Sequence, residues 1–69
     1  MICVFVAIAA DVEGNDTAVF MNATIELDRM PQSVEDLDYM AAEVVKQIAA
    51  VRNVPIVRGV IISYQAMTP

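Results

Sequence analysis

Acidic side chains are the chemically reactive groups that gather most closely in this sequence. Asp11, Glu13 and Asp16 lie beside Gly14 and Asn15, and an oxygen-rich run of this kind could bind calcium. An EF-hand, however, needs a longer loop of fixed ligand spacing that ends in a bidentate glutamate, and this run has neither feature. We therefore interpret residues 11–16 as a solvated turn.

The chain lacks the residues on which most catalytic sites depend. Histidine is absent and Cys3 is the single cysteine, so His-based catalytic triads, Cys/His zinc sites and an intrachain disulfide are all excluded. No basic side chain precedes Arg29 to activate the thiol, and we interpret Cys3 as buried and inert. Asp36 and Asp38 are two apart on an expected helix, so their side chains diverge. We predict no enzyme activity, no metal and no cofactor.

Ligand binding has little support in the sequence. The only glycines are Gly14 and Gly59, so no glycine-rich phosphate loop exists. Four scattered bases without an aromatic-basic stripe do not make a nucleic-acid surface, and we predict no direct nucleic-acid binding. Tyr64, Arg58 and Glu43 are the few polar candidates for a small-molecule pocket between subunits.

Two strands are expected in the first part of the chain. Residues 2–10 are rich in β-branched side chains and apolar at both odd and even positions, which is typical of a central strand covered on both faces. Gly14 and Asn15 tolerate positive φ, so the chain is expected to reverse there. Residues 17–28 then alternate apolar and polar side chains near their end, which predicts a strand with one wet face.

A helix and a third strand are expected to follow. Ser33 is expected to cap the helix by accepting a hydrogen bond from the backbone N–H of Asp36, and Asn53 with Pro55 should end it near residue 52. Gly59 suggests a bulge or a close backbone approach in a strand over residues 56–67, and Thr68 and Pro69 are expected to end the chain without a tail. The helix has an apolar stripe at three- and four-residue spacing: Leu37, Met40, Ala41, Val44, Ile48 and Val51.

These elements predict a single α+β domain over residues 1–69. The expected fold is strand-strand-helix-strand, with a three-stranded antiparallel sheet in the order 2-1-3 and the helix on one face. The alternative is the order 1-2-3, in which the third strand lies parallel to the second after a right-handed crossover.

The apolar content exceeds what one helix can cover. The chain has 69 residues, of which 58% are hydrophobic, and a domain of this size usually needs a disulfide, a metal or a partner subunit. One helix covers one sheet face, so the first strand is expected to leave one of two sets uncovered: Ile2, Val4, Val6 and Ile8, or Cys3, Phe5, Ala7 and Ala9.

We therefore expect a homodimer, formed by packing of sheet faces or by pairing of sheet edges. The alternatives are that a neighbouring loop or the Met30–Pro31 segment folds over the open face, or that a different obligate partner covers it. The residues expected in self-association are Val4, Phe5, Val6, Phe20, Ile61 and Tyr64.

The charge distribution favours basic protein partners. Nine acids oppose four bases, which disfavours nucleic acids and anionic membranes as partners. In size and charge the chain resembles the small inhibitors encoded by bacteriophages and mobile elements, including anti-CRISPR proteins, which implies an inhibitor or regulator of a larger, possibly nucleic-acid-binding protein. The alternative is a structural or assembly subunit that acts as a homo-oligomer. The acids expected to engage a basic groove are Asp11, Glu13, Asp16, Glu26, Asp28, Glu35, Asp36 and Asp38.

The N-terminal apolar run does not predict export. Residues 2–10 are too few to span a bilayer, lack a preceding basic segment and lead directly into Asp11, so they are not expected to form a signal peptide. A single unpaired thiol suits a reducing compartment. The cytoplasm, or the host cytoplasm if the protein is viral, is the expected location.

Overall fold

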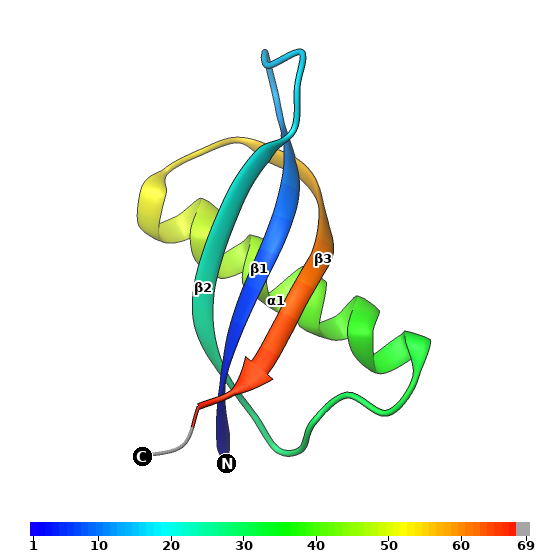
Figure 1. The fold of residues 1–69 in the computed structure, drawn as a ribbon. Coiled ribbons are helices and arrows are strands. Elements are labelled where there is room, and N and C mark those ends of the chain that lie inside the picture. The colour runs from blue at the N-terminus through cyan, green and yellow to red at the C-terminus, as the bar shows by residue number, and fades with distance from the viewer. Residues whose placement is uncertain (68–69) are drawn as a thin grey trace.

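The fold is a three-stranded antiparallel sheet with one helix packed against it. The computed structural model describes residues 1–67, with β1 (Ile2–Val12), β2 (Val19–Leu27), α1 (Val34–Arg52) and β3 (Ile56–Ala66) in chain order. The strand order is β2-β1-β3, and β1 is antiparallel to both neighbours (Figure 1). The predicted α+β class and 2-1-3 order are confirmed, and the 1-2-3 alternative is wrong. The expected chain end at Thr68 and Pro69 lies outside the described residues.

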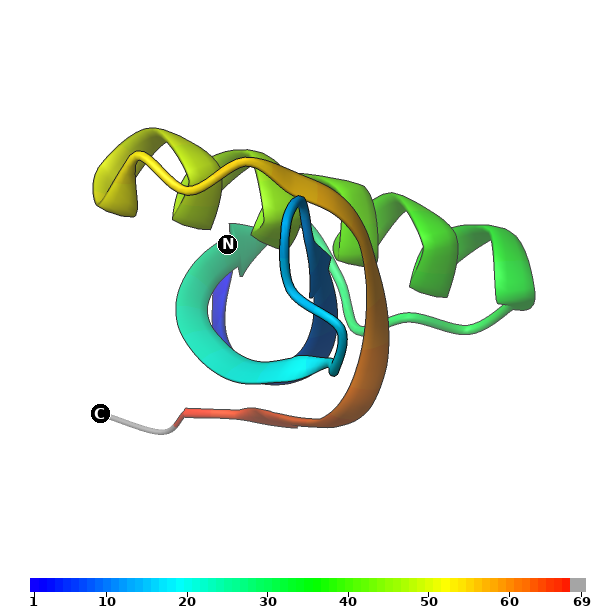
Figure 2. The same cartoon turned by 90° about the horizontal axis from the view of Figure 1, so that it is seen from above.

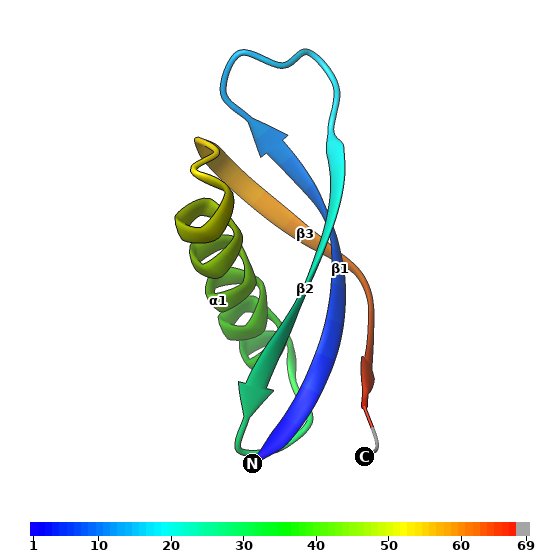
Figure 3. The ribbon, with the colours of Figure 1, turned by 90° about the vertical axis from the view of Figure 1, so that its left-hand side faces the viewer.

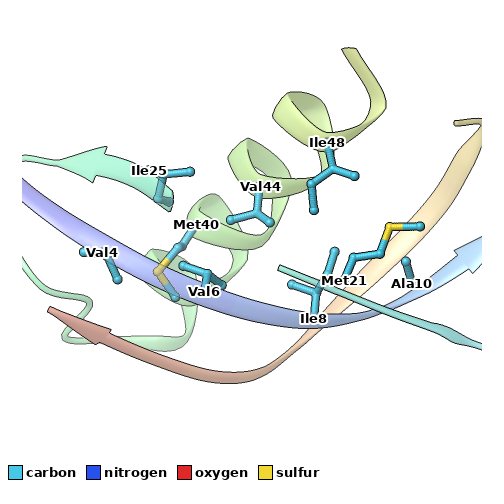
Figure 4. Close-up of a cluster of buried hydrophobic side chains, with 9 residues drawn as sticks. All are labelled: Val4, Val6, Ile8, Ala10, Met21, Ile25, Met40, Val44 and Ile48. Carbon is cyan, nitrogen blue, oxygen red and sulfur yellow. The ribbon is translucent and has the colours of Figure 1, made fainter. Parts of the chain in front are cut away.

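The hydrophobic core lies between α1 and one face of the sheet. Every second residue of β1 points toward the helix, because successive side chains of a strand alternate between faces. These residues meet a buried row on α1 and two side chains of β2 (Figure 4). The core consists of Val4, Val6, Ile8, Ala10, Met21, Ile25, Met40, Val44 and Ile48.

A loop over residues 13–18 joins β1 to β2 and forms the tip of the hairpin. Gly14 has a φ of 90°, a value that glycine adopts without steric cost, and the Asn15 N–H donates to the Val12 carbonyl at 3.0 Å. The predicted reversal is confirmed. Only Gly14 uses a positive φ there, however, since Asn15 does not have one.

The helix begins and ends at its predicted caps. The Ser33 hydroxyl accepts from the Asp36 N–H at 3.1 Å, and the Asp36 carboxylate accepts from the backbone N–H of Gln32 at 3.0 Å. Asn53 adopts the left-handed conformation with φ 54° directly after Arg52. Val51 was expected on the covered stripe but is 78% exposed. The stripe therefore ends one turn earlier, at Ile48.

Removal of the helix cap should destabilise the protein measurably. Ser33→Ala leaves the Asp36 N–H without its side-chain acceptor at the start of the helix, so the free energy of unfolding should fall by about 1 kcal/mol. Urea denaturation followed by circular dichroism measures the change. Ser33→Asp keeps an acceptor and should lose much less; an equal loss in both variants would contradict the role of the hydroxyl.

Strong twist of the sheet carries the end of β3 away from the helix. Seen from above and from the side, β3 begins close to α1 and ends on the far side of the molecule (Figures 2 and 3). Solvent exposure rises along β3 as the strand leaves the helix. Gly59 and Ile61 are half-buried, whereas every residue from Ile62 to Met67 is exposed. The pairing with β1 shifts register beside Ile62 and beside Val57, as at β-bulges, which increase local twist.

Candidate protein-binding surface

The sheet face that lies away from the helix is apolar along β1. The side chains that alternate with the core residues on this strand are Cys3, Phe5, Ala7 and Ala9. Of the two sets that the sequence analysis offered, this one lies away from the helix, with Phe5 36% exposed and the other three side chains half-buried. Cys3 is only half-buried, so the interpretation of its thiol as buried is corrected.

The neighbouring strands extend this apolar region at one end. Ala9 pairs with Phe20 on β2 and with Val60 on β3, so the three side chains form a row across the sheet. Phe20 is 77% exposed, and Val60 is also exposed. We call the surface formed by Cys3, Phe5, Ala7, Ala9, Phe20 and Val60 the open face.

The loop before the helix does not fold over the open face. Met30 is half-buried and packs against the core on the helix side of the sheet. Its neighbour Pro31 lines a pocket together with Asp36 and Tyr39 of the helix. The alternative in which the Met30–Pro31 segment shields the open face is therefore wrong.

Acidic side chains lie at both ends of the open face. Asp11 ends the row on β1 and pairs with Arg58 at 3.2 Å between Oδ2 and Nη2, and Glu13 and Asp16 follow in the hairpin loop. At the other end, Glu26 pairs with Cys3 in the β1–β2 register. Asp28 follows just after β2 but lines a pocket together with Asp36 and Tyr39 of the helix.

The predicted acidic residues do not form one continuous surface. Glu35, Asp36 and Asp38 belong to the helix, which lies on the opposite side of the sheet from the open face (Figure 3). Asp36 also serves the chain itself, because its carboxylate caps the helix and lies 3.7 Å from Arg29 Nη2. Acids of the hairpin thus flank one end of the open face and Glu26 lies at the other, whereas Asp28 lies beside the acids of the helix.

Two of the six residues expected in self-association are not available at the surface. Val4 and Val6 are fully buried beneath the helix, whereas Ile61 is half-buried. The assignment of Val4 and Val6 is corrected, because both sets of β1 side chains are apolar and only the position of the helix distinguishes core from surface. Phe5, Phe20 and Tyr64 are exposed.

A groove of about 730 Å³ separates the helix from the first half of β3. Its lining is mostly apolar, and the charged residues in it are Asp38, Lys46 and Arg58. Of the three polar candidates for a ligand pocket, only Arg58 lines this groove, and Tyr64 and Glu43 do not. The apolar lining includes Leu37, Ala41, Val45, Val57, Gly59 and Ile61.

Residues 1–67 contain no group of three acidic or cysteine side chains placed to share a metal ion. Within the same residues, no helix has the length and apolar character needed to cross a membrane. Comparison with known protein families, with curated proteins and with solved structures found no match. The geometry of the chain itself is therefore the basis for assigning a function.

Proposed function

We propose that this protein acts by binding another protein through the open face of its sheet. The observation that carries the proposal is an apolar row along β1 that neither the helix nor the Met30–Pro31 loop covers. Burial of apolar surface contributes about 25 cal/mol per Å², so a few hundred Å² of this face is worth several kcal/mol on association. An apolar sheet face of this kind is typical of an interaction site.

The acids at the two ends of the open face define the chemistry of the partner. A complementary surface has an apolar strip bounded by basic side chains. Glu13 and Asp16 meet one basic group, and Glu26 meets another. Basic clefts occur on nucleic-acid-binding proteins. The protein thus acts as an inhibitor or regulator that occupies such a surface, without chemistry of its own.

The proposal is tested by comparing two variants that remove equally exposed apolar side chains. Phe20 on the open face is 77% exposed and Val51 on the helix is 78% exposed. With the protein as bait in lysate of its native cells, wild type and Val51→Ser should retain the same partner, whereas Phe20→Ser should lose at least about 90% of it. Quantitative mass spectrometry measures the retained partner.

The same experiment separates the apolar and electrostatic contributions. Retention by wild type should fall as salt is raised from about 50 to 500 mM, because exposed charges are screened over shorter distances at higher salt. Equal retention by Phe20→Ser and Val51→Ser would overturn the assignment of the open face. Retention that does not change with salt would overturn the basic character of the partner.

A second candidate function is that of an assembly subunit whose working form is a homo-oligomer. The observation that favours it is the outer edge of β3, which pairs with no other strand in the described chain and is exposed from Ile62 onward. A strand edge of this kind is a template for pairing with another chain.

A further inference from the structure

The two outer edges of the sheet differ in whether another side chain hydrogen-bonds to their backbone. At β2, the helix reaches the edge strand, and the Gln47 side-chain amide donates to the Thr24 carbonyl at 3.0 Å. At β3, the described residues provide no side-chain hydrogen bond to the backbone of the strand. The strand runs from Ile56 to Ala66 and carries a single charge, Arg58.

The helix carries a second feature beside this edge. Asp38, Ala42 and Lys46 follow one another at four-residue intervals, so they form one row along the helix surface. All three are exposed and line the groove next to β3. In the described part of the chain, neither Asp38 nor Lys46 forms an ion pair with its own chain, whose two ion pairs involve other residues.

The row is complementary to itself. It has an acid at one end, a base at the other and a small side chain in the middle. When two such helices run antiparallel about a two-fold axis near Ala42, Asp38 of each copy faces Lys46 of the other copy. A two-fold contact requires self-complementarity of this kind.

We propose that two copies of this chain form a dimer in which the β3 edges pair antiparallel and the helix rows oppose each other. Antiparallel pairing of identical strands places the two-fold axis perpendicular to the sheet, so the sheets join into one and both helices stay on the same face. In Figure 1 the N-terminal half of α1 extends past β3, toward the place that the second copy would occupy.

The net charge and the surface area of the chain are compatible with a second copy bound at the β3 edge. Each chain carries a charge of −5, so two copies repel each other unless acids are absent from the contact or meet bases. β3 has no acid, and the antiparallel arrangement places the acidic N-terminal half of each helix beside the half of the other that carries Lys46 and Arg52. A standard interface buries about 800 Å² per partner, which is about one sixth of the 4822 Å² surface of this chain. The strand edge, the groove and the helix row lie side by side and together form this contact.

The dimer does not depend on binding through the open face, and it rests on the second candidate function, the homo-oligomer. It uses the edge of β3 and the flank of the helix, whereas the open face lies on the other side of the sheet, apart from Val60, which also lines the groove beside the helix. Two copies joined in this way present two open faces side by side on one surface. The dimer can therefore form whether or not the open face binds another protein.

Charge reversal tests the helix contact. Asp38→Lys places two bases opposite each other and Lys46→Asp places two acids opposite each other, so each variant should raise the dimer dissociation constant by about tenfold or more. The double variant Asp38→Lys/Lys46→Asp restores opposite charges and should return the constant to near the wild-type value. Sedimentation velocity over a concentration series measures it, and circular dichroism checks the fold.

A pair of lysine substitutions tests the strand contact. Ile62 on β3 is 53% exposed, so Ile62→Lys should dissociate the dimer, whereas Phe20→Lys on the open face should leave it intact. A wild-type protein that sediments as a monomer up to about 1 mM would overturn the proposal. If Phe20→Lys dissociates the dimer and Ile62→Lys does not, the proposal is overturned in favour of packing between open faces. If the double charge variant does not regain a dissociation constant near the wild-type value, the helix contact is overturned.

Discussion

Met40→Ala is expected to lower the free energy of unfolding by about 2–5 kcal/mol, which is a large part of the stability that a domain of this size has. Met40 is fully buried and lies in the core opposite Val4 and Val6 of the central strand (Figure 4). Its truncation removes apolar contacts and leaves a cavity, because β1 and the helix are both held by other contacts and cannot close the space.

Urea denaturation followed by circular dichroism measures this loss, with Val34→Ala as the matched control. Val34 is on the same helix but is 74% exposed, so its truncation should change the free energy of unfolding by less than about 0.5 kcal/mol. The measurements are compared at several protein concentrations, since the proposed dimer would add stability that depends on concentration. Equal losses of free energy of unfolding in the two variants would contradict the assignment of Met40 to the core and Val34 to the surface.

The secondary structure and strand order could be predicted because local signals agree with one another. Ser33 and Asn53 cap the helix as their side chains and backbone preferences indicate, and Gly14 turns the hairpin. The order β2-β1-β3 follows from a central strand that is apolar on both faces. These features depend on a few neighbouring residues or on simple periodicity, which is the information that a single sequence carries.

The division between core and surface could not be predicted in the same way. Phe5 and Val6 are both apolar neighbours on β1, and only the position of the helix makes one exposed and the other buried. Val51 fits the helical spacing, yet it is exposed beyond Ile48, where the buried row of α1 ends.

The twist of the sheet is a further property that the sequence pattern does not show. Tyr64 pairs with Val6 and so belongs to the helix-facing side by register, yet it is exposed because twist carries this part of β3 away from α1. The spacing of Asp38, Ala42 and Lys46 can be read from the sequence. Only the structure shows that this row lies beside the unpaired edge of β3. Tertiary placement therefore decides which surfaces are open to a partner.

Gly59→Ala is expected to lower the free energy of unfolding by about 1–3 kcal/mol, although alanine restricts the unfolded chain more than glycine does. A Cβ atom at residue 59 would lie 2.6 Å from Val45 Cγ2 and 3.1 Å from Ile8 Cδ1. Val45 is β-branched and cannot swing aside freely, so the helix must move away from β3. The predicted close approach at Gly59 is confirmed, and it sets how near the two elements lie.

A double-mutant cycle identifies this contact as the cause. Val45→Ala removes the methyl group that a new Cβ atom would meet. The double variant Gly59→Ala/Val45→Ala should therefore lose about 1 kcal/mol less free energy of unfolding than the two single variants lose together. Additive losses would show that Gly59 is needed for another reason. Because Val45 and Gly59 both line the groove beside β3, the single variant Gly59→Ala should also widen that groove and weaken any contact made there.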